Sequence, residues 1–167
     1  MIGAFRQRVK RTLENYKEVI MLKVLKMYPD AMLPSKAYPE DAGYDLYAHI
    51  PLGKLTILPG QSILIGTGIK VSVKAGCAMH ITNRSGLASK HKLFVGACIV
   101  DPGYSNEVFV NLHNMGNMDY VVSHGDRIAQ AMVYHLSPGM VELNADDYET
   151  EMQSFSRNKN GFGSSGK

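Results

Sequence analysis

The sequence predicts one all-β domain, either a sandwich or a barrel, and three observations lead to this fold class. From Met21 onward, short runs rich in β-branched and aromatic residues follow one another at close spacing. Clusters of Gly, Pro, Asn and Asp separate these runs and supply the turns. The 167 residues are 45% hydrophobic, enough for one domain with a core, and no apolar run is long enough to span a membrane.

The first 20 residues predict a short amphipathic, basic helix. Apolar side chains from Ile2 to Ile20 recur at steps of three and four, the spacing of one helical face. Five cations and two anions in this segment account for the whole net charge of +3. We expect it to be the only substantial helix. Its role is either packing or binding to a membrane surface, a targeting receptor or nucleic acid.

The remaining elements are expected to be strands, each an apolar run that ends at a turn. The turns are Pro59-Gly60, Lys74-Ala75-Gly76, Pro102-Gly103 and Ser123-His124-Gly125-Asp126. The expected strands are Leu22–Met27, Leu55–Leu58, Ser62–Thr67, Ile69–Val73, Ala78–Thr82, Phe94–Val100, Glu107–Leu112, Tyr120–Val122 and Ala129–Leu136. We find no internal repeat, and we treat residues 21–150 as the domain and 151–167 as a C-terminal arm.

Asp101 is the first candidate for chemistry. It follows the apolar run Phe94–Val100 and precedes Pro102-Gly103-Tyr104, so we expect it to lie at a hairpin beside a buried strand. A carboxylate at that place can orient and deprotonate a water molecule. The alternative is structural, because Asp-Pro-Gly commonly opens a β-turn.

Two further segments predict an anion site. Arg84 and Ser85 follow the strand Ala78–Thr82 at the start of a possible short helix, where a guanidinium, a hydroxyl and free N–H groups can bind an anion. In the segment Gly125–Gln130, Asp126 can pair with Arg127 while Gln130 offers a neutral donor to phosphate. A capped surface helix with a solvated Arg84 is the alternative.

Asp45 is a second carboxylate, between small residues and the strand-like Leu46–Ile50. It can support an arginine or a metal-bound water, or it can be a turn residue. None of the six histidines stands in a metal-binding spacing, which argues against a zinc hydrolase. Cys77 and Cys98 form no C-x-x-C pattern, so we expect neither a disulfide nor a cysteine metal site, and a reducing, cytoplasmic location.

The last eleven residues form a glycine-rich segment that can wrap a phosphorylated, planar ligand. Glycines let backbone N–H groups approach phosphate, Ser164 and Ser165 add hydroxyl donors, Arg157 adds charge, and Phe162 offers a ring face to a base. A solubilising Gly/Ser tail is the alternative.

Five segments of this chain, in order, resemble the five motifs of trimeric deoxyuridine triphosphatases. The resemblance covers the chain from about Met21 to the C-terminus and implies a jelly-roll β trimer with active sites between subunits. It also implies magnesium-dependent hydrolysis of dUTP to dUMP and pyrophosphate, which limits uracil in DNA and supplies dUMP. The matching segments are Ala42–Leu46, Arg84–Ala88, Asp101–Tyr104, Gly125–Gln130 and Arg157–Gly166.

The resemblance also implies roles for single residues. Asp101 would activate the attacking water, Tyr104 would pack under deoxyribose and exclude a 2′-hydroxyl, and Asp45 would lie near the water shell of the metal. Magnesium would be held by phosphate oxygens and water, without a direct protein ligand. The phosphate ligands would be Arg84, Ser85, Gly86 and Gln130, and the backbone around Val108 and Val110 would recognise the base.

The arm has implied roles too. Arg157, Gly163, Ser164 and Ser165 would contact phosphate, and Phe162 would stack on uracil. No stable binding of nucleic acid or membrane is expected.

The chain departs from the family pattern at three places. Cys98 stands where the family usually carries Gly, Ser105-Asn106 replaces a common Arg-Gly, and Arg157 is followed by Asn158 rather than Gly. These changes bear on the geometry around Asp101 and in the arm.

Two alternative functions belong to other classes. A related fold serves dCTP deaminases, but these place a catalytic Glu where this chain has Asn111, and an amide cannot shuttle the required proton. The second alternative is a regulatory binding protein on a deoxyuridine triphosphatase scaffold.

Overall fold

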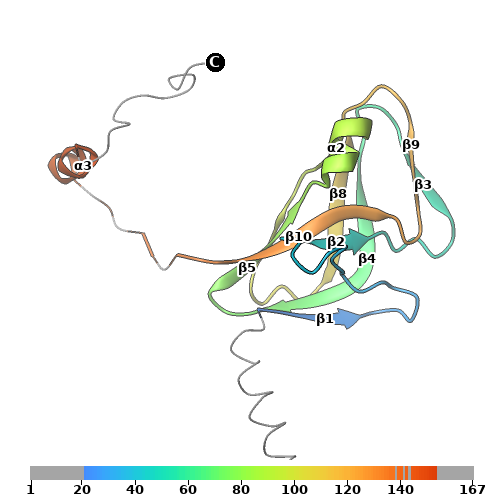
Figure 1. Cartoon of the computed structure of the whole chain (residues 1–167), viewed down its shortest axis with the longest axis horizontal. Helices are drawn as coiled ribbons and strands as arrows, with labels where there is room; N and C mark the ends of the chain where they lie inside the picture. Colours follow the sequence, from blue (N-terminus) through green and yellow to red (C-terminus); the bar gives the residue numbers. More distant parts are fainter. Residues whose placement is uncertain (1–20, 138, 141, 143, 154–167) are drawn as a thin grey trace, which may run out of the picture. The chain divides into compact units, whose positions relative to one another are not determined.

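The computed structural model describes residues 21–137, 139, 140, 142 and 144–153. Its strands form two four-stranded antiparallel sheets and one two-stranded pair, which confirms the all-β, jelly-roll-like fold class (Figure 1). The predicted helix at residues 1–20 and the arm residues 154–167 lie outside the described residues. The chain divides into two compact units, one ending at Leu136 and one beginning at Ser137.

The first sheet has the strand order β1-β4-β8-β6, and the second has the order β2-β10-β5-β7. Strands β3 and β9 form the two-stranded pair. The bounds are β1 Leu22–Lys26, β2 Tyr44–Tyr47, β3 Lys54–Ile57, β4 Ser62–Val73, β5 Cys77–Thr82, β6 Leu93–Val95, β7 Ile99–Val100, β8 Glu107–Asn114, β9 Tyr120–Ser123 and β10 Arg127–His135, with the helix α2 at Ser85–His91.

Buried and exposed side chains alternate along the strands, and the buried ones form the core. In β8, Val108, Val110 and Leu112 are buried, whereas Phe109 between them is 43% exposed. The side chain of buried Asn114 donates to the carbonyls of Ile57 and Met118, at 2.9 and 2.7 Å, and accepts the N–H of Gly116 at 2.9 Å. This buried amide is therefore satisfied and ties β8 to β3.

Three of the expected strands are divided differently in the structure. The expected strands Ser62–Thr67 and Ile69–Val73 form one strand, β4, because an irregularity between Gly66 and Lys70 keeps the pairing with β8. At this irregularity the Glu107 carboxylate accepts the N–H of Gly68 at 2.7 Å.

The expected strand Phe94–Val100 is two strands in different sheets, because the chain crosses between the sheets at residues 96–98. β6 pairs with β8, and β7 pairs with β5. The hairpin expected at Asp101 is therefore wrong, because the strands on either side of it, β7 and β8, belong to different sheets. A Cβ at Gly96 would collide with the ring of His113, so this crossing needs glycine.

The expectation of a single substantial helix at the N-terminus was also wrong. Helix α3 covers Ala145–Met152 in the second unit. Asn144 caps it by accepting the N–H of Asp147 at 2.9 Å, and Asp146 and Asp147 lie in the first turn, where negative charge is favoured. Its sequence is polar on most faces, so the apolar periodicity that predicts a packed helix is missing.

Candidate active site

A polar cleft of about 250 Å³ lies where β2, β10 and the beginning of α2 meet. The structure thus brings together the predicted residues Asp45, Arg84, Ser85, Gly86 and Gln130, which come from three separate segments of the sequence. The lining is completed by Ala37, Asp41, Ala42, Gly43 and Arg127.

Asp45 organises the charges of this cleft. One carboxylate oxygen accepts the Nε–H of Arg84 at 2.8 Å, and the other accepts an N–H of Arg127 at 3.3 Å. Arg84 also donates to the carbonyl of Arg127 at 3.0 Å. The pairing expected between Asp126 and Arg127 is wrong, because Asp126 instead accepts the N–H of Ser123 within its own turn at 2.8 Å.

These contacts decide between the two interpretations of Arg84. Its side chain is 24% exposed and held by two acceptors, so it is not a freely solvated surface cation. Asp45, 13% exposed, is saturated by two guanidinium groups and is an arginine-supporting residue rather than a turn residue. Two guanidinium groups share this one carboxylate, and Asp41 also lines the cleft, so an anion would be bound by directed N–H donors rather than by a net positive charge.

Gln130 faces this cleft from β10, where it pairs with Asp45 of β2 and Thr82 of β5. Its amide nitrogen donates to the carbonyl of Asn83 at 3.1 Å. A Cβ at Gly43 would come within 2.7 Å of its amide oxygen. Glycine at position 43 therefore leaves the space in which Gln130 sits.

The residues around Asp101 form a type II turn, as the Asp-Pro-Gly sequence predicts. The N–H of Tyr104 donates to the carbonyl of Asp101 at 3.2 Å, and Gly103 has a φ of +86°. The Tyr104 hydroxyl donates to the carbonyl of Glu107 at 2.8 Å, which fixes the ring beside the turn. Asp101 is exposed, so water reaches its carboxylate.

A second, larger cleft of about 400 Å³ lies beside this turn. Gly103, Tyr104 and Ser105 line one side of it, and Lys23 and Lys70 bring two cations from β1 and β4. The sequence analysis did not single out either lysine. Both lysines face the turn only because β1 pairs with β4 and β4 pairs with β8. No local pattern in the sequence shows this pairing.

Within one chain, Asp101 and the polar cleft lie at opposite ends of β5. Arg84 follows the Thr82 end, whereas Val100 pairs with Met79, so Asp101 continues toward the Cys77 end. At about 3.3 Å per strand residue, Asp101 and Arg84 are on the order of 15 Å apart within one chain. The two clefts share no lining residue.

The other predicted residues are placed as follows. Val108 and Val110 are buried in β8, and the Val108 carbonyl accepts the Thr67 hydroxyl at 2.6 Å. Cys98 is half-buried, and its carbonyl accepts the N–H of Ile81 at 2.7 Å. Arg157, Phe162, Gly163, Ser164 and Ser165 lie outside the described residues.

One ionisable group near the cleft has a shifted pKa. Burial raises the pKa of the Tyr120 phenol above its ordinary value of 10.0; the charge of Asp126 raises it further, and that of Arg84 opposes the rise. The phenol is therefore neutral at physiological pH.

The sequence from residue 30 to residue 166 matches the family model described as dUTPase. The chain belongs to the dUTPase family. It is 36% identical over 153 residues to the deoxyuridine 5'-triphosphate nucleotidohydrolase of Maricaulis maris, covering 88% of this chain and 95% of that protein.

Solved dUTPase structures share the fold. The dUTPase of Staphylococcus bacteriophage 80alpha, solved with dUpNHpp, has a TM-score of 0.73 and 24% identity, covering 87% of this chain and 98% of that one. A dUTPase of phage phi11 of S. aureus, whose structure describes a structural Mg(II) ion, has a TM-score of 0.67 and 21% identity, covering 75% of this chain and 97% of that one. In the described part of this dUTPase-family chain, no helix is long and apolar enough to cross a membrane.

Proposed function

We propose that this protein hydrolyses dUTP to dUMP and pyrophosphate. The observation that carries the proposal is the family match over residues 30–166, together with the cleft and the turn that its motifs build. The cleft supplies the cations and neutral donors that bind phosphate, and the turn supplies an exposed carboxylate that can take a proton from water.

Binding is assigned to the polar cleft and chemistry to the turn. Arg84, Ser85, Gly86 and Gln130 bind the phosphates, and Asp45 holds Arg84 in position. Asp101 accepts the proton of a water molecule that attacks phosphorus, and Tyr104 packs under the deoxyribose. The backbone around Val108 and Val110 recognises the base, and Arg157, Phe162, Gly163, Ser164 and Ser165 complete the site from the arm, residues 151–167.

Magnesium fits this site as a partner of the phosphates. Both oxygens of Asp45 are engaged by arginines, so this carboxylate is suited to the outer water shell rather than to direct coordination. When bound, the ion would neutralise charge that develops on the phosphate oxygens. The residues nearest to its water shell would be Asp45 and Asp41, both of which line the cleft.

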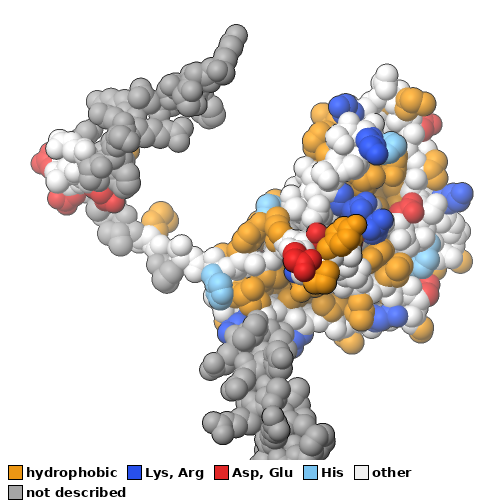
Figure 2. Space-filling view, viewed as in Figure 1, with side chains coloured by type: hydrophobic (Ala, Val, Ile, Leu, Met, Phe, Trp, Pro, Cys, Tyr) orange, Lys and Arg blue, Asp and Glu red, His pale blue; other side chains and the backbone are white. Residues whose placement is uncertain are grey.

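The complete site is assigned to a homotrimer. The separation of Asp101 from Arg84 along β5 supports a site in which the two residues come from different chains. The surface supports association as well, because Leu25, Leu64, Phe94 and Phe109 are exposed on the strands of the first sheet. Figure 2 shows apolar side chains spread over the visible face of the strand unit.

The test is release of pyrophosphate from dUTP, UTP and dCTP by the purified protein with Mg²⁺. We expect kcat/KM for dUTP to exceed that for either other nucleotide by roughly 10²-fold or more. If the protein deaminates dCTP without preference for dUTP, it is a deaminase instead. If it binds dUTP tightly without turnover, it is a regulatory binding protein.

Replacing Tyr104 with Ala should reduce the discrimination between dUTP and UTP. The ring fixed by the bond to Glu107 would exclude the 2′-hydroxyl by steric contact, and an alanine removes that contact. The measurement is the ratio of the two kcat/KM values, expected to fall by at least about tenfold. Tyr104→Phe is the companion variant, since it keeps the ring but loses the bond to Glu107, and it separates the steric effect of the ring from its positioning. An unchanged ratio in Tyr104→Ala refutes the role.

A further inference from the structure

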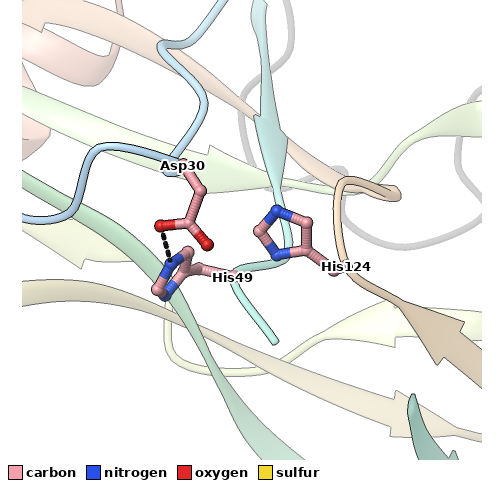
Figure 3. A group of neighbouring side chains, drawn as sticks. All are labelled: Asp30, His49 and His124. Atoms are coloured by element: carbon pink, nitrogen blue, oxygen red, sulfur yellow. Dashed lines mark hydrogen bonds and ion pairs between the residues drawn. The ribbon is translucent and has the colours of Figure 1, made fainter. Parts of the chain in front are cut away.

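Three side chains that could bind a metal gather at one corner of the strand unit, outside the candidate active site. Asp30 comes from the connection between β1 and β2, His49 from the segment after β2, and His124 from the turn between β9 and β10 (Figure 3). Their ligand atoms all lie within 4.8 Å of one another. None of the three lines either cleft.

The ring of His49 is held in place from several sides. Tyr28 stacks on it with a centroid distance of 4.6 Å and an interplanar angle of 6°. Its Nε2 hydrogen-bonds to the Asp30 carboxylate at 3.1 Å, and a Cβ at Gly68 would collide with it. The side chain is only 7% exposed, so its position is set by packing.

The turn that carries His124 is fixed to the two residues that flank His49 in the sequence, Ala48 and Ile50. The N–H of Ala48 donates to the carbonyl of Asp126, and the N–H of Gly125 donates to the carbonyl of Ala48, both at 2.8 Å. The N–H of Ile50 donates to Nδ1 of His124 at 3.1 Å. These three bonds keep the two imidazole rings close, with centroids 5.3 Å apart.

We propose that Asp30, His49 and His124 bind one transition-metal ion of the Zn²⁺ class. Two imidazole nitrogens and one carboxylate oxygen form a ligand set that suits Zn²⁺ better than Mg²⁺ or Ca²⁺, which prefer oxygen ligands. Three protein ligands leave at least one position for water. The site is independent of the magnesium that accompanies the nucleotide.

Binding changes the local hydrogen bonds. In the metal-free chain the Nε2–H of His49 donates to Asp30, so the ion displaces that proton and takes the nitrogen lone pair. His124 gives up its bond from the Ile50 N–H when its ring presents a lone pair to the ion. In the metal-free chain the hydrogen bond from His49 lowers the pKa of Asp30 from its ordinary value of 3.8.

The ion would connect three segments that are distant in the sequence. One of them, the turn at residues 123–126, leads directly into Arg127 of the polar cleft. Because a metal that binds only the folded chain stabilises it, thermal unfolding should shift upward when Zn²⁺ is added. This readout does not depend on the proposed hydrolysis of dUTP.

The experiment titrates the full chain, stripped with a chelator, with Zn²⁺ in a calorimeter and with Co²⁺ by visible absorption. We expect one ion per chain, and affinity at least about tenfold lower in Asp30→Asn and in His124→Gln. His91→Gln is the matched control, because His91 lies on α2 and outside the cluster, and its affinity should equal that of the wild type.

Asp30→Asn is the decisive variant, because Asp30 is 52% exposed and its replacement leaves the packing around His49 in place. Circular dichroism without metal verifies that each variant is folded. The proposal is overturned if the wild type shows no saturable binding of one ion per chain, or if folded Asp30→Asn binds Zn²⁺ as tightly as the wild type.

Discussion

We expect that replacing Asp101 with Asn will lower dUTP turnover by roughly 10²–10⁴-fold and leave nucleotide binding nearly unchanged. An amide cannot take the proton of the attacking water, but it has the size and polarity of the carboxylate. The turn itself is held by the bond from the Tyr104 N–H to the Asp101 carbonyl and by Gly103, neither of which needs the carboxylate. The substitution therefore tests chemistry rather than folding.

Two quantities are measured for each variant: kcat for pyrophosphate release, and the Kd of a non-hydrolysable dUTP analogue. Asp119→Asn is the matched control, since Asp119 is also an exposed loop aspartate but lies outside both clefts. Near-normal turnover in Asp101→Asn would leave the Asp-Pro-Gly turn with only a structural role.

Ending the chain at Ser156 should remove most of the activity, by roughly 10²-fold or more, and leave the strand unit folded. The removed segment carries Arg157 and the glycine-rich residues assigned to phosphate, and closure of such a segment over a ligand excludes water. The ten strands of the described residues all end by His135, so the truncation leaves their pairing intact.

Two full-length variants show which part of the arm matters. Arg157→Ala should lower kcat/KM because it removes a charge from the phosphates, whereas Phe162→Ala should mainly raise KM because it removes stacking on the base. If the shortened chain turns over dUTP at the rate of the full chain, the arm is only a solubilising tail.

The prediction of strands from local patterns succeeded where a strand is an independent apolar run. β1 and β3 are examples, because each ends at a turn that Pro or Gly marks in the sequence. The prediction failed where tertiary pairing decided the boundary. Gly96 is the only local sign of a break in Phe94–Val100, and the division itself arises because Val95 pairs with Leu112 in one sheet while Ile99 pairs with His80 in the other.

For the candidate site, too, local motifs could be predicted from the sequence, whereas contacts that depend on strand pairing could not. Sequence analysis named Asp45, Arg84 and Gln130 from their motifs, and the structure places all three in one cleft. It could not show that Arg127 shares the carboxylate of Asp45, because that contact depends on the register of β2 against β10. It also gave no reason to join His49 with His124, since metal spacings in a sequence reveal only ligands that are neighbours along the chain.

We propose that a working site in the trimer takes Asp101 from one chain and the arm, residues 151–167, from another, and this proposal can be tested by mixing two inactive variants. Asp101→Asn chains and chains ending at Ser156 are refolded together, and mass spectrometry verifies mixed trimers. We expect pyrophosphate release from dUTP to recover with the mixing ratio, because some sites then combine an intact Asp101 with an intact arm. We expect no recovery when the two pure trimers are combined without exchange. Verified mixed trimers that stay as inactive as their parents would contradict the shared site.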